Sequence, residues 1–373
     1  MRLNPADGLL YILTKLLKSF DRRQTDMEYF EPDKVKNILV VSSTAIGDTL
    51  LSTPAIRAVR ERYPDAKIIG HFSIKNMELF ENNPHISRII PYYGGYRKFL
   101  RTIRELRRHK FDLALIFHGN EPQAVPMAYL SGARFISKLP FPRKNDFLLS
   151  NKGCDTEIGG LHNIDVKLKS TTFFGCTSTS REMVLIVGMT ERDFASNYLA
   201  KKGITQDNFI IGFQVGAANQ YKVWPPESFA MLGKRLLSYD PGIRIIITGS
   251  KQEKKLCSSV AAAIGQNALS VAGGLTLRQM GALIEAMDIL VTNDTGAMHM
   301  AVALRTKTVS LFCPTDDWAV GPLQDLRLHK VIKKDRPCNP CITKKCTTPH
   351  CMELITVDEV FQTTVEHLHI ADA

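Results

Sequence analysis

Residues 288–304 decide the fold, and they read DILVTNDTGAMHMAVAL. Residues 288–292 predict a buried strand, and residues 298–304 predict the helix that follows it. The Thr295-Gly296 turn between them leaves backbone N–H groups free at the carboxyl end of the strand, where α/β proteins hold phosphate groups. His299 follows Thr295 by four residues and so returns to the same face of the helix. The stretch therefore predicts an anion site with a polar side chain above it.

Alternating strand and helix patterns begin near Val35 and continue through most of the chain. Such alternation is typical of a parallel sheet that helices cover on both faces. In the first half of the chain we expect strands at residues 37–41, 67–71 and 111–117, and helices at 49–62 and 97–109. Pro54 should kink or restart the first of these helices, because proline donates no helical hydrogen bond.

A second alternating series predicts strands at residues 209–213, 243–247, 269–271, 289–292 and 308–312, and a final helix at 357–370. Thr276 and Gln279 have the spacing of a capping box and should open a helix that ends near Met287. Between about residues 140 and 180 the periodicity fades, which places the linker there. The predicted organisation is a helical extension at 1–34, Rossmann-like domains at 35–180 and 181–355, and a helix at 356–373. Two doubly wound parallel sheets in tandem predict a cleft between their carboxyl edges.

Length and charge narrow the functional classes. A chain of 373 residues favours two domains, and none of its apolar runs approaches the roughly 20 residues that span a bilayer. Lys and Arg outnumber Asp and Glu by 48 to 37, which favours an anionic partner: nucleic acid, a phosphorylated substrate or an acidic membrane surface. No nucleic-acid-binding motif accompanies the charge, so we expect no nucleic acid among the partners.

The first thirty residues predict an amphipathic helix. Leu and Ile recur at helical spacing between residues 9 and 17, and Lys15, Lys18, Arg22 and Arg23 accompany them. Lys15 interrupts the apolar run and no small-residue cleavage site follows, so a signal peptide is not expected. The helix could lie on an anionic membrane surface or dock on the protein itself. Either interpretation predicts a cytoplasmic protein.

Three further turns follow predicted strands. Asp48 lies in a turn that lacks the glycines of a dinucleotide fingerprint, and it suits a general base, although spacing alone favours a helix cap. Lys222 could neutralise a diphosphate leaving group, and the commoner alternative is an exposed surface lysine. Glu253, or Gln252 beside it, could bond ribose hydroxyls, with helix capping as the alternative.

Taken together, these turns resemble glycosyltransferase family 9, the bacterial lipopolysaccharide heptosyltransferases. The resemblance rests on STAIGDTLLSTPAI at 43–56, KVWP at 222–225, TG at 248–249 and DTGAMH at 294–299. FCPTD at 312–316 and GP at 321–322 extend it. It covers about residues 35–370, and its specificity lies in the combination of motifs.

The resemblance implies a GT-B fold and inverting transfer of heptose from ADP-heptose to the lipid A–core acceptor. The first Rossmann-like domain would bind the acceptor and the second the nucleotide sugar. By the same resemblance Asp48 is the base, and Thr44 and Gly47 are candidates for contacting the acceptor. The donor-binding residues it implies are Lys222, Glu253, Asp294, Thr295, Gly296 and His299.

The implied partners are a nucleotide-sugar donor, an anionic glycolipid and the cytoplasmic surface of the inner membrane. No cofactor is required, because lysine and a helix dipole supply the positive charge. His118 and Asn120, which follow a strand, are further acceptor-side candidates. Two alternatives remain: a GT-B transferase that uses another nucleotide sugar or acceptor, and a non-catalytic protein that binds nucleotides or sugar phosphates.

Four cysteines form a cluster near the C-terminus, at Cys338, Cys341, Cys346 and Cys351. Their C-x2-C-x4-C-x4-C spacing could hold a structural zinc ion or an iron–sulfur centre, although it is not a standard zinc ribbon. A reduced cluster without metal is the favoured alternative. Disulfides are not expected in the cytoplasm.

Overall fold

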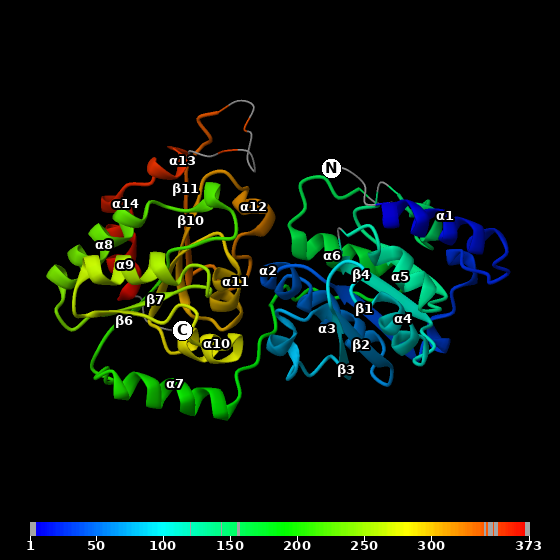
Figure 1. The fold of residues 1–373 in the computed structure, drawn as a ribbon, viewed down its shortest axis with the longest axis horizontal. Coiled ribbons are helices and arrows are strands. Elements are labelled where there is room, and N and C mark those ends of the chain that lie inside the picture. The colour runs from blue at the N-terminus through cyan, green and yellow to red at the C-terminus, as the bar shows by residue number, and fades with distance from the viewer. Residues whose placement is uncertain are drawn as a thin grey trace. The chain divides into compact units, whose positions relative to one another are not determined.

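The computed structural model describes residues 5–119, 121–142, 144–154, 157–338, 341, 346 and 350–369. The chain divides into two compact units, Met1–Val184 and Leu185–Ala373, each built on its own parallel sheet (Figure 1). The sequence-based boundary lies after residue 180. Within the described part of the chain, no helix has both the length and the apolar character that crossing a bilayer requires.

The sheet of the first unit has the strand order β3-β2-β1-β4-β5, with every pair parallel. Its central strands are continuous runs of buried aliphatic residues, as expected of a sheet covered on both faces. Ser42, at the carboxyl end of β1, pairs with Phe72 of β2 and with His118 of β4, so three strand ends meet at one edge. The strands are β1 (Asn37–Ser42), β2 (Lys67–Ser73), β3 (Arg88–Tyr92), β4 (Leu113–His118) and β5 (Phe135–Lys138).

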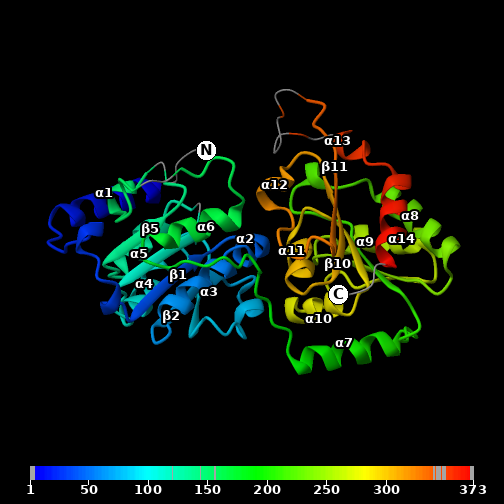
Figure 2. The same ribbon diagram turned by 180° about the vertical axis from the view of Figure 1, so that it is seen from behind.

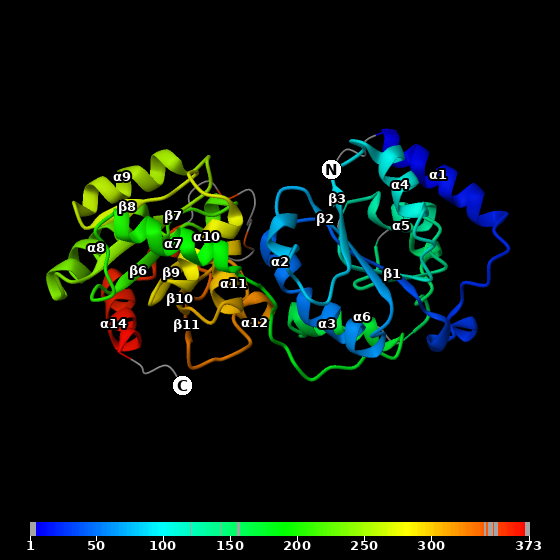
Figure 3. The same cartoon turned by 90° about the horizontal axis from the view of Figure 1, so that it is seen from below.

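Helices cover both faces of this sheet (Figures 1 and 3). On one face, Leu106 of α4 and Met127 of α5 pack against Leu39 and Ile116. On the other face, α3 packs against α6, which also contacts β4. The helices are α1 (Pro5–Ser19), α2 (Ile46–Leu50), α3 (Thr53–Arg62), α4 (Phe99–Arg107), α5 (Ala124–Leu130) and α6 (Asn163–Thr172).

The second unit repeats this plan with the strand order β11-β10-β9-β6-β7-β8. Helices α8, α9 and α14 share one hydrophobic core with the sheet, while α7, α10 and α11 pack together on the other side (Figure 2). The strands are β6 (Ile210–Gln214), β7 (Arg244–Thr248), β8 (Ala268–Ser270), β9 (Ile289–Asn293), β10 (Lys307–Phe312) and β11 (His329–Lys333). The helices are α7 (Met189–Lys201), α8 (Pro226–Tyr239), α9 (Lys254–Ile264), α10 (Leu277–Glu285), α11 (Gly296–Ala303), α12 (Asp317–Val320), α13 (His350–Glu353) and α14 (Val357–Leu368).

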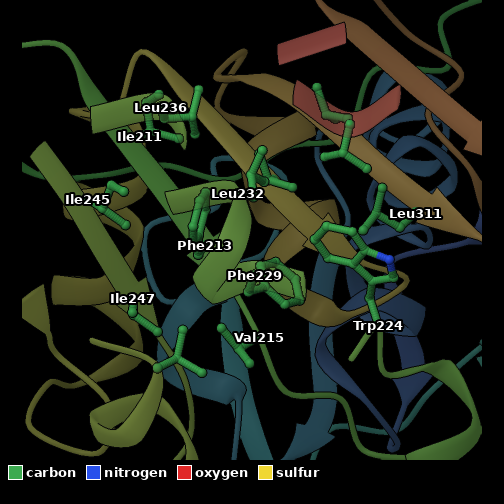
Figure 4. Close-up of a cluster of buried hydrophobic side chains, with 14 of the residues drawn as sticks. Ile211, Phe213, Val215, Trp224, Phe229, Leu232, Leu236, Ile245, Ile247 and Leu311 are labelled. Atoms are coloured by element: carbon green, nitrogen blue, oxygen red, sulfur yellow. The ribbon is translucent and has the colours of Figure 1, made fainter. Parts of the chain in front are cut away.

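Trp224 anchors the core of the second unit (Figure 4). Its ring is fully buried and meets Phe229 edge to face, with 4.9 Å between ring centroids. Its indole N–H donates to the carbonyl oxygen of Ile355 at 2.9 Å, which satisfies the polar atom that burial would otherwise leave without a partner. Trp224 comes two residues after Lys222, so packing of the indole holds the chain near that lysine.

Several expectations from the sequence are confirmed, and one helix was missed. Thr276 and Gln279 form the predicted capping box, and Pro54 lies in the first turn of α3, where the chain restarts after α2. The stretch at 140–180, however, is not only a linker, because it contains α6. This helix was missed because its buried face carries polar side chains, including Ser170 and Thr171, and so lacks apolar periodicity.

The N-terminal helix α1 docks on the first unit by one face only. The helix lies against α5 (Figure 3). Leu10 and Thr14 are its buried residues, and Tyr96 donates a hydrogen bond to Asp7 at 2.7 Å. Its other face is uncovered and exposes large apolar side chains: Leu9, Ile12, Leu13, Leu16 and Leu17, with Phe20 following. Docking on the protein is therefore confirmed for half of the helix, and the other half remains available to a partner.

His71 makes the stability of the first unit depend on pH. Its Nδ1 donates to the carbonyl oxygen of Ile90 at 2.8 Å, while its buried Nε2 has no partner. Burial lowers the pKa of His71 to about 4, below its ordinary 6.5, and the hydrogen bond to Ile90 opposes this shift only in part. The folded protein therefore holds this imidazole neutral.

We predict that the unfolding free energy falls as the pH drops from about 6.5 to 4. The unfolded chain binds a proton at His71 in that range and the folded chain does not, which costs up to about 3 kcal/mol. His71→Phe should lower the number of protons taken up on unfolding at pH 5 by about one. Urea titrations at several pH values measure this number, and an unchanged pH slope in the variant would contradict the assignment.

Candidate functional site

In the first unit, the β1–α2 turn places Asp48 in the first turn of α2. The N-cap position belongs to Ala45, and no side chain caps the helix, so the capping interpretation of Asp48 is wrong. Gly47, a predicted acceptor contact, is buried in the same short helix. The Asp48 carboxylate is partly exposed and instead meets two polar side chains, Thr44 and His118.

Asp48, Thr44 and His118 form a closed triangle of polar contacts. The Thr44 hydroxyl lies 2.8 Å from Asp48 Oδ2 and 2.5 Å from His118 Nδ1. The third side joins His118 Nε2 to Asp48 Oδ1 at 3.3 Å. His118 comes from the end of β4, so the register of the sheet brings together residues that are 70 positions or more apart. Asn120, the other acceptor-side candidate, lies outside the described residues.

The triangle lacks one proton in its resting state. The pKa of His118 is lowered to about 4, mainly by burial; Asp48 opposes this shift, and the nearby ammonium groups of Lys167 and Lys138 add to it. A neutral imidazole and the Thr44 hydroxyl bring two protons to these three contacts. Two protons serve the two hydrogen bonds of Thr44, and the His118 Nε2–Asp48 Oδ1 contact is left without one. Such a cluster suits the removal of a proton from a bound hydroxyl.

Two buried lysines lie near this triangle. Lys138 ends β5 and Lys167 lies on α6, and their side chains are 5% and 4% exposed. Burial lowers the pKa of each ammonium to about 8. Neither was identified from the sequence, because a lysine in a strand or helix normally signals an exposed face.

In the second unit, the β9–α11 turn carries the predicted anion site. Asp294 is buried and accepts a hydrogen bond from Lys222 Nζ at 2.5 Å. Lys222 is therefore not an exposed surface lysine, and Asp294 balances its charge. Thr295 is the N-cap residue of α11 but no side chain caps this helix, and Gly296 opens it. The amides of its first turn are thus free of the side-chain cap that many helices carry.

Asn293 holds these turns in place. Its side-chain amide donates to the carbonyl oxygens of Val215 at 2.9 Å and Gln214 at 3.2 Å. Its side-chain oxygen accepts the backbone N–H of Trp224 at 3.0 Å. One fully buried side chain therefore joins the ends of β6 and β9 to the segment that presents Lys222. Sequence analysis did not identify this role.

The Glu253 carboxylate makes a hydrogen bond within the turn that follows β7. It accepts the backbone N–H of Ser250 at 2.7 Å and makes no capping bond to α9, so the helix-capping alternative is not formed. Its other oxygen lies so close to Gly216 that a Cβ there would be 1.9 Å away. Gly216 is therefore required for the carboxylate to approach the turn after β6. His299 is buried one turn into α11.

The four clustered cysteines are free thiols. The structure describes these four cysteines but not residues 339–340, 342–345 or 347–349 between them. Among the residues it does describe, no three His, Cys, Asp or Glu side chains form a group that could hold a metal ion. Burial raises the pKa of the nearby Cys313 thiol to about 12, with a further contribution from Cys351. The structural metal therefore stays a prediction.

Comparison with known proteins assigns the family. A family model described as glycosyltransferase family 9 (heptosyltransferase) matches residues 99–352, more than half of the chain. The chain belongs to glycosyltransferase family 9. It is therefore a glycosyltransferase, and the resemblance seen in the motifs is confirmed.

Individual members of family 9 are similar over nearly the whole length. Lipooligosaccharide heptosyltransferase 2 of Campylobacter jejuni is 24% identical over 335 residues, which cover 87% of this chain and 96% of that protein. A family 9 glycosyltransferase of Veillonella parvula gives a TM-score of 0.74 at 21% identity, covering 89% of this chain and 97% of the other. Escherichia coli ADP-heptose lipopolysaccharide heptosyltransferase II gives 0.72 at 23% identity, covering 89% and 98%. The two parallel-sheet units are thus those of the GT-B fold.

The Lys222–Asp294 pair yields a test that does not depend on substrate. We predict that Lys222→Met destabilises the second unit by about 3 kcal/mol, because it leaves a buried carboxylate without its cation. Adding Asp294→Asn should restore most of the loss. Lys234→Met, at an exposed position of α8, is the matched control and should change stability by less than about 0.5 kcal/mol. Urea unfolding of the four proteins measures the effect, and equal stabilities of Lys222→Met and the control would contradict it.

Proposed function

We propose that this family 9 enzyme transfers heptose from ADP-heptose to the inner core of lipopolysaccharide, with inversion at the anomeric carbon. The triangle of Asp48, Thr44 and His118 carries the proposal, because it is a proton acceptor at a solvent-accessible sheet edge. Support also comes from the relatives named above, one of which is a lipooligosaccharide heptosyltransferase and another an ADP-heptose enzyme.

The acceptor half of the reaction belongs to the first unit. Asp48 takes the proton of the acceptor hydroxyl as its oxygen forms the bond to the anomeric carbon. The accepted proton completes the third contact of the triangle, so His118 and Thr44 stabilise the protonated product. This stabilisation increases as the reaction proceeds, which is what a catalytic interaction requires. Thr44 and Gly47 border the position of the acceptor in this proposal.

The donor half belongs to the second unit. The bond between the anomeric carbon and the diphosphate oxygen breaks, and ADP leaves with the electron pair. Lys222 and the free amides of Thr295 and Gly296 stabilise the negative charge that develops on the diphosphate, and His299 lies in the same helix. Asp294 orients Lys222. Glu253 contacts the nucleoside. Lysine and helix amides supply the positive charge at the leaving group, so the reaction as proposed uses no metal.

Asp48→Asn tests the base. We expect it to lower transfer from ADP-heptose to a truncated core acceptor at least about 100-fold, because an amide cannot accept the proton. The affinity for ADP-heptose should change less than twofold, since Asp48 does not contact the donor. Initial rates and calorimetric binding give the two quantities, with UDP- and GDP-sugars as controls for the nucleotide.

Retained turnover in Asp48→Asn would remove Asp48 as the base. Equal binding of the ADP, UDP and GDP sugars by the wild-type enzyme would instead overturn the donor assignment. The two failures are separate, because the first concerns the β1–α2 turn and the second concerns the other unit.

We further propose that the enzyme works in the cytoplasm, bound to the inner face of the membrane that carries its acceptor. The uncovered face of α1 supports this, because Leu9, Leu16 and Phe20 are 69%, 57% and 82% exposed. The exposed side chains of Lys15 and Arg22 add positive charge beside them. Apolar side chains flanked by basic ones are suited to an anionic phospholipid surface.

The double variant Leu16→Glu with Phe20→Glu tests this surface. We expect it to weaken binding to vesicles of phosphatidylcholine and phosphatidylglycerol about 100-fold. The variant loses two apolar side chains that would be buried in the lipid surface, and it gains two negative charges that an anionic surface repels. Met189→Glu with Met231→Glu, at exposed positions of the second unit, is the control and should bind like the wild-type protein. Co-sedimentation measures binding, and equal loss in both double variants would contradict a specific role of α1.

A further inference from the structure

Lys138 and Lys167 are the feature of the first unit that the proposed reaction does not yet use. Lys138 is the last residue of β5, and Ile116 of β4 is its partner in the sheet, two residues before His118. Lys167 lies in the middle of α6, which packs against β4. Both ammonium groups are close enough to His118 to lower its pKa, and Asp48 acts on Lys167. The two lysines therefore belong to the neighbourhood of the Asp48 triangle.

These two ammonium groups have far fewer hydrogen-bond acceptors than donors. Lys167 Nζ donates to the carbonyl oxygen of Asn163 at 3.3 Å. Among the described residues, no hydrogen bond or ion pair reaches Lys138 Nζ. An ammonium group carries three donors, so two of them bring six N–H bonds to this single acceptor. Buried cations that lack partners are costly, and proteins keep them where a ligand provides the missing acceptors.

The nearby carboxylates do not meet this need. Glu121 influences Lys138 through its charge, but its oxygen accepts from the Ser43 hydroxyl at 3.0 Å. Asp48 influences Lys167, but it is held by Thr44 and His118. Neither carboxylate is within ion-pair distance of either lysine. Among the described residues, these two carboxylates act on the lysines only through their charge, and Asn163 supplies one hydrogen-bond acceptor for the six N–H groups.

The ammonium of Lys138 can reach a ligand. Its side chain is buried along its length, but its Nζ atom is not fully sealed from solvent. His118, on which Lys138 acts, and its contact Asp48 are partly exposed, with 22% and 29% of their side chains accessible. A bound molecule that contacts Asp48 and His118 would therefore also lie near the two ammonium groups that act on His118.

We propose that Lys138 and Lys167 form an anion subsite that binds a carboxylate or phosphate group of the acceptor and so positions its hydroxyl at Asp48. The proposal rests on the transferase function proposed above. An oxyanion supplies several acceptor atoms at once, which matches the unused N–H groups of two lysines that approach from different elements. The subsite would select acceptors that carry an acidic group near the reacting hydroxyl.

The test compares Lys138→Met and Lys167→Met with Lys169→Met. Lys169 lies on the same helix as Lys167, and its ammonium donates to the carbonyl oxygen of Glu157 at an exposed position. Methionine keeps the length of the side chain and removes the charge. We expect kcat/KM for the intact acidic acceptor to fall about 10- to 100-fold in each buried-lysine variant, as loss of a charge-assisted hydrogen bond implies. The KM for the nucleotide sugar should stay within twofold, and Lys169→Met should match the wild-type enzyme.

Two chemically altered acceptors identify the source of the anion. One is treated with phosphatase and the other has its sugar carboxylates reduced to alcohols. The acceptor that has lost the relevant group should be used equally by wild-type enzyme and the lysine variants, whereas the other should still distinguish them. Calorimetry with inorganic phosphate provides a direct probe, and its affinity should drop in the Lys138→Met/Lys167→Met double variant and not in Lys169→Met.

Thermal unfolding separates binding from a structural role. Because each lysine is buried with few partners, its replacement by methionine should leave the melting temperature unchanged or raise it. A lower melting temperature with equal loss on acidic and neutral acceptors would overturn the subsite. Unchanged kcat/KM in both variants would overturn it as well. Absence of transfer by the wild-type enzyme with every acceptor would instead contradict the proposed function. In that case, phosphate calorimetry on its own would show whether the two lysines bind an anion.

Discussion

Parallel strand pairing is the constraint on which both units depend. When all strands of a sheet run in one direction, every strand–helix turn of a given kind falls at the same edge. In the first unit this brings the ends of β1, β4 and β5 together, and with them Asp48, His118 and Lys138. In the second unit it joins the ends of β6 and β9, which the Asn293 side chain then ties to each other. The pairing register of the strands therefore determines which functional side chains meet at the sheet edge of each unit.

The two edges are electrostatically different. In the second unit, the cation and carboxylate of Lys222 and Asp294 are paired directly, so the turn is ordered before a ligand arrives. In the first unit, Lys138 and Lys167 are buried with no ion pair to any described residue, and the carboxylates of Glu121 and Asp48 contact hydroxyl groups and an imidazole. The edge of the second sheet is preorganised by an ion pair, whereas the edge of the first sheet has lysine N–H groups that can still donate hydrogen bonds to a ligand.

The local sequence predicts the features that short-range spacing determines, such as helix caps, helix restarts and buried strands. The capping box at Thr276, the restart at Pro54 and most central strands follow from spacing and apolar runs alone. The β1–α2 turn was identified, but spacing alone favoured a helix cap for Asp48, because its partner His118 lies on another strand, and only the family resemblance assigned Asp48 as the base. Helix α6 was missed because its buried face is polar. Lys138 and Lys167 were missed for a related reason, since only tertiary packing reveals that these lysines are buried.

Half of α1 is fixed to the protein, and this has a geometric consequence. A hydrophobic anchor joined by a loose tether leaves a domain free to tumble above whatever surface it holds. In this protein Leu10 and Thr14 pack α1 against α5, and the Tyr96–Asp7 hydrogen bond fastens it to the segment before α4. If the exposed face of α1 binds a surface, the first unit is therefore held at one fixed orientation relative to that surface. The direction in which the sheet edge of that unit points is then set by the axis of a single helix.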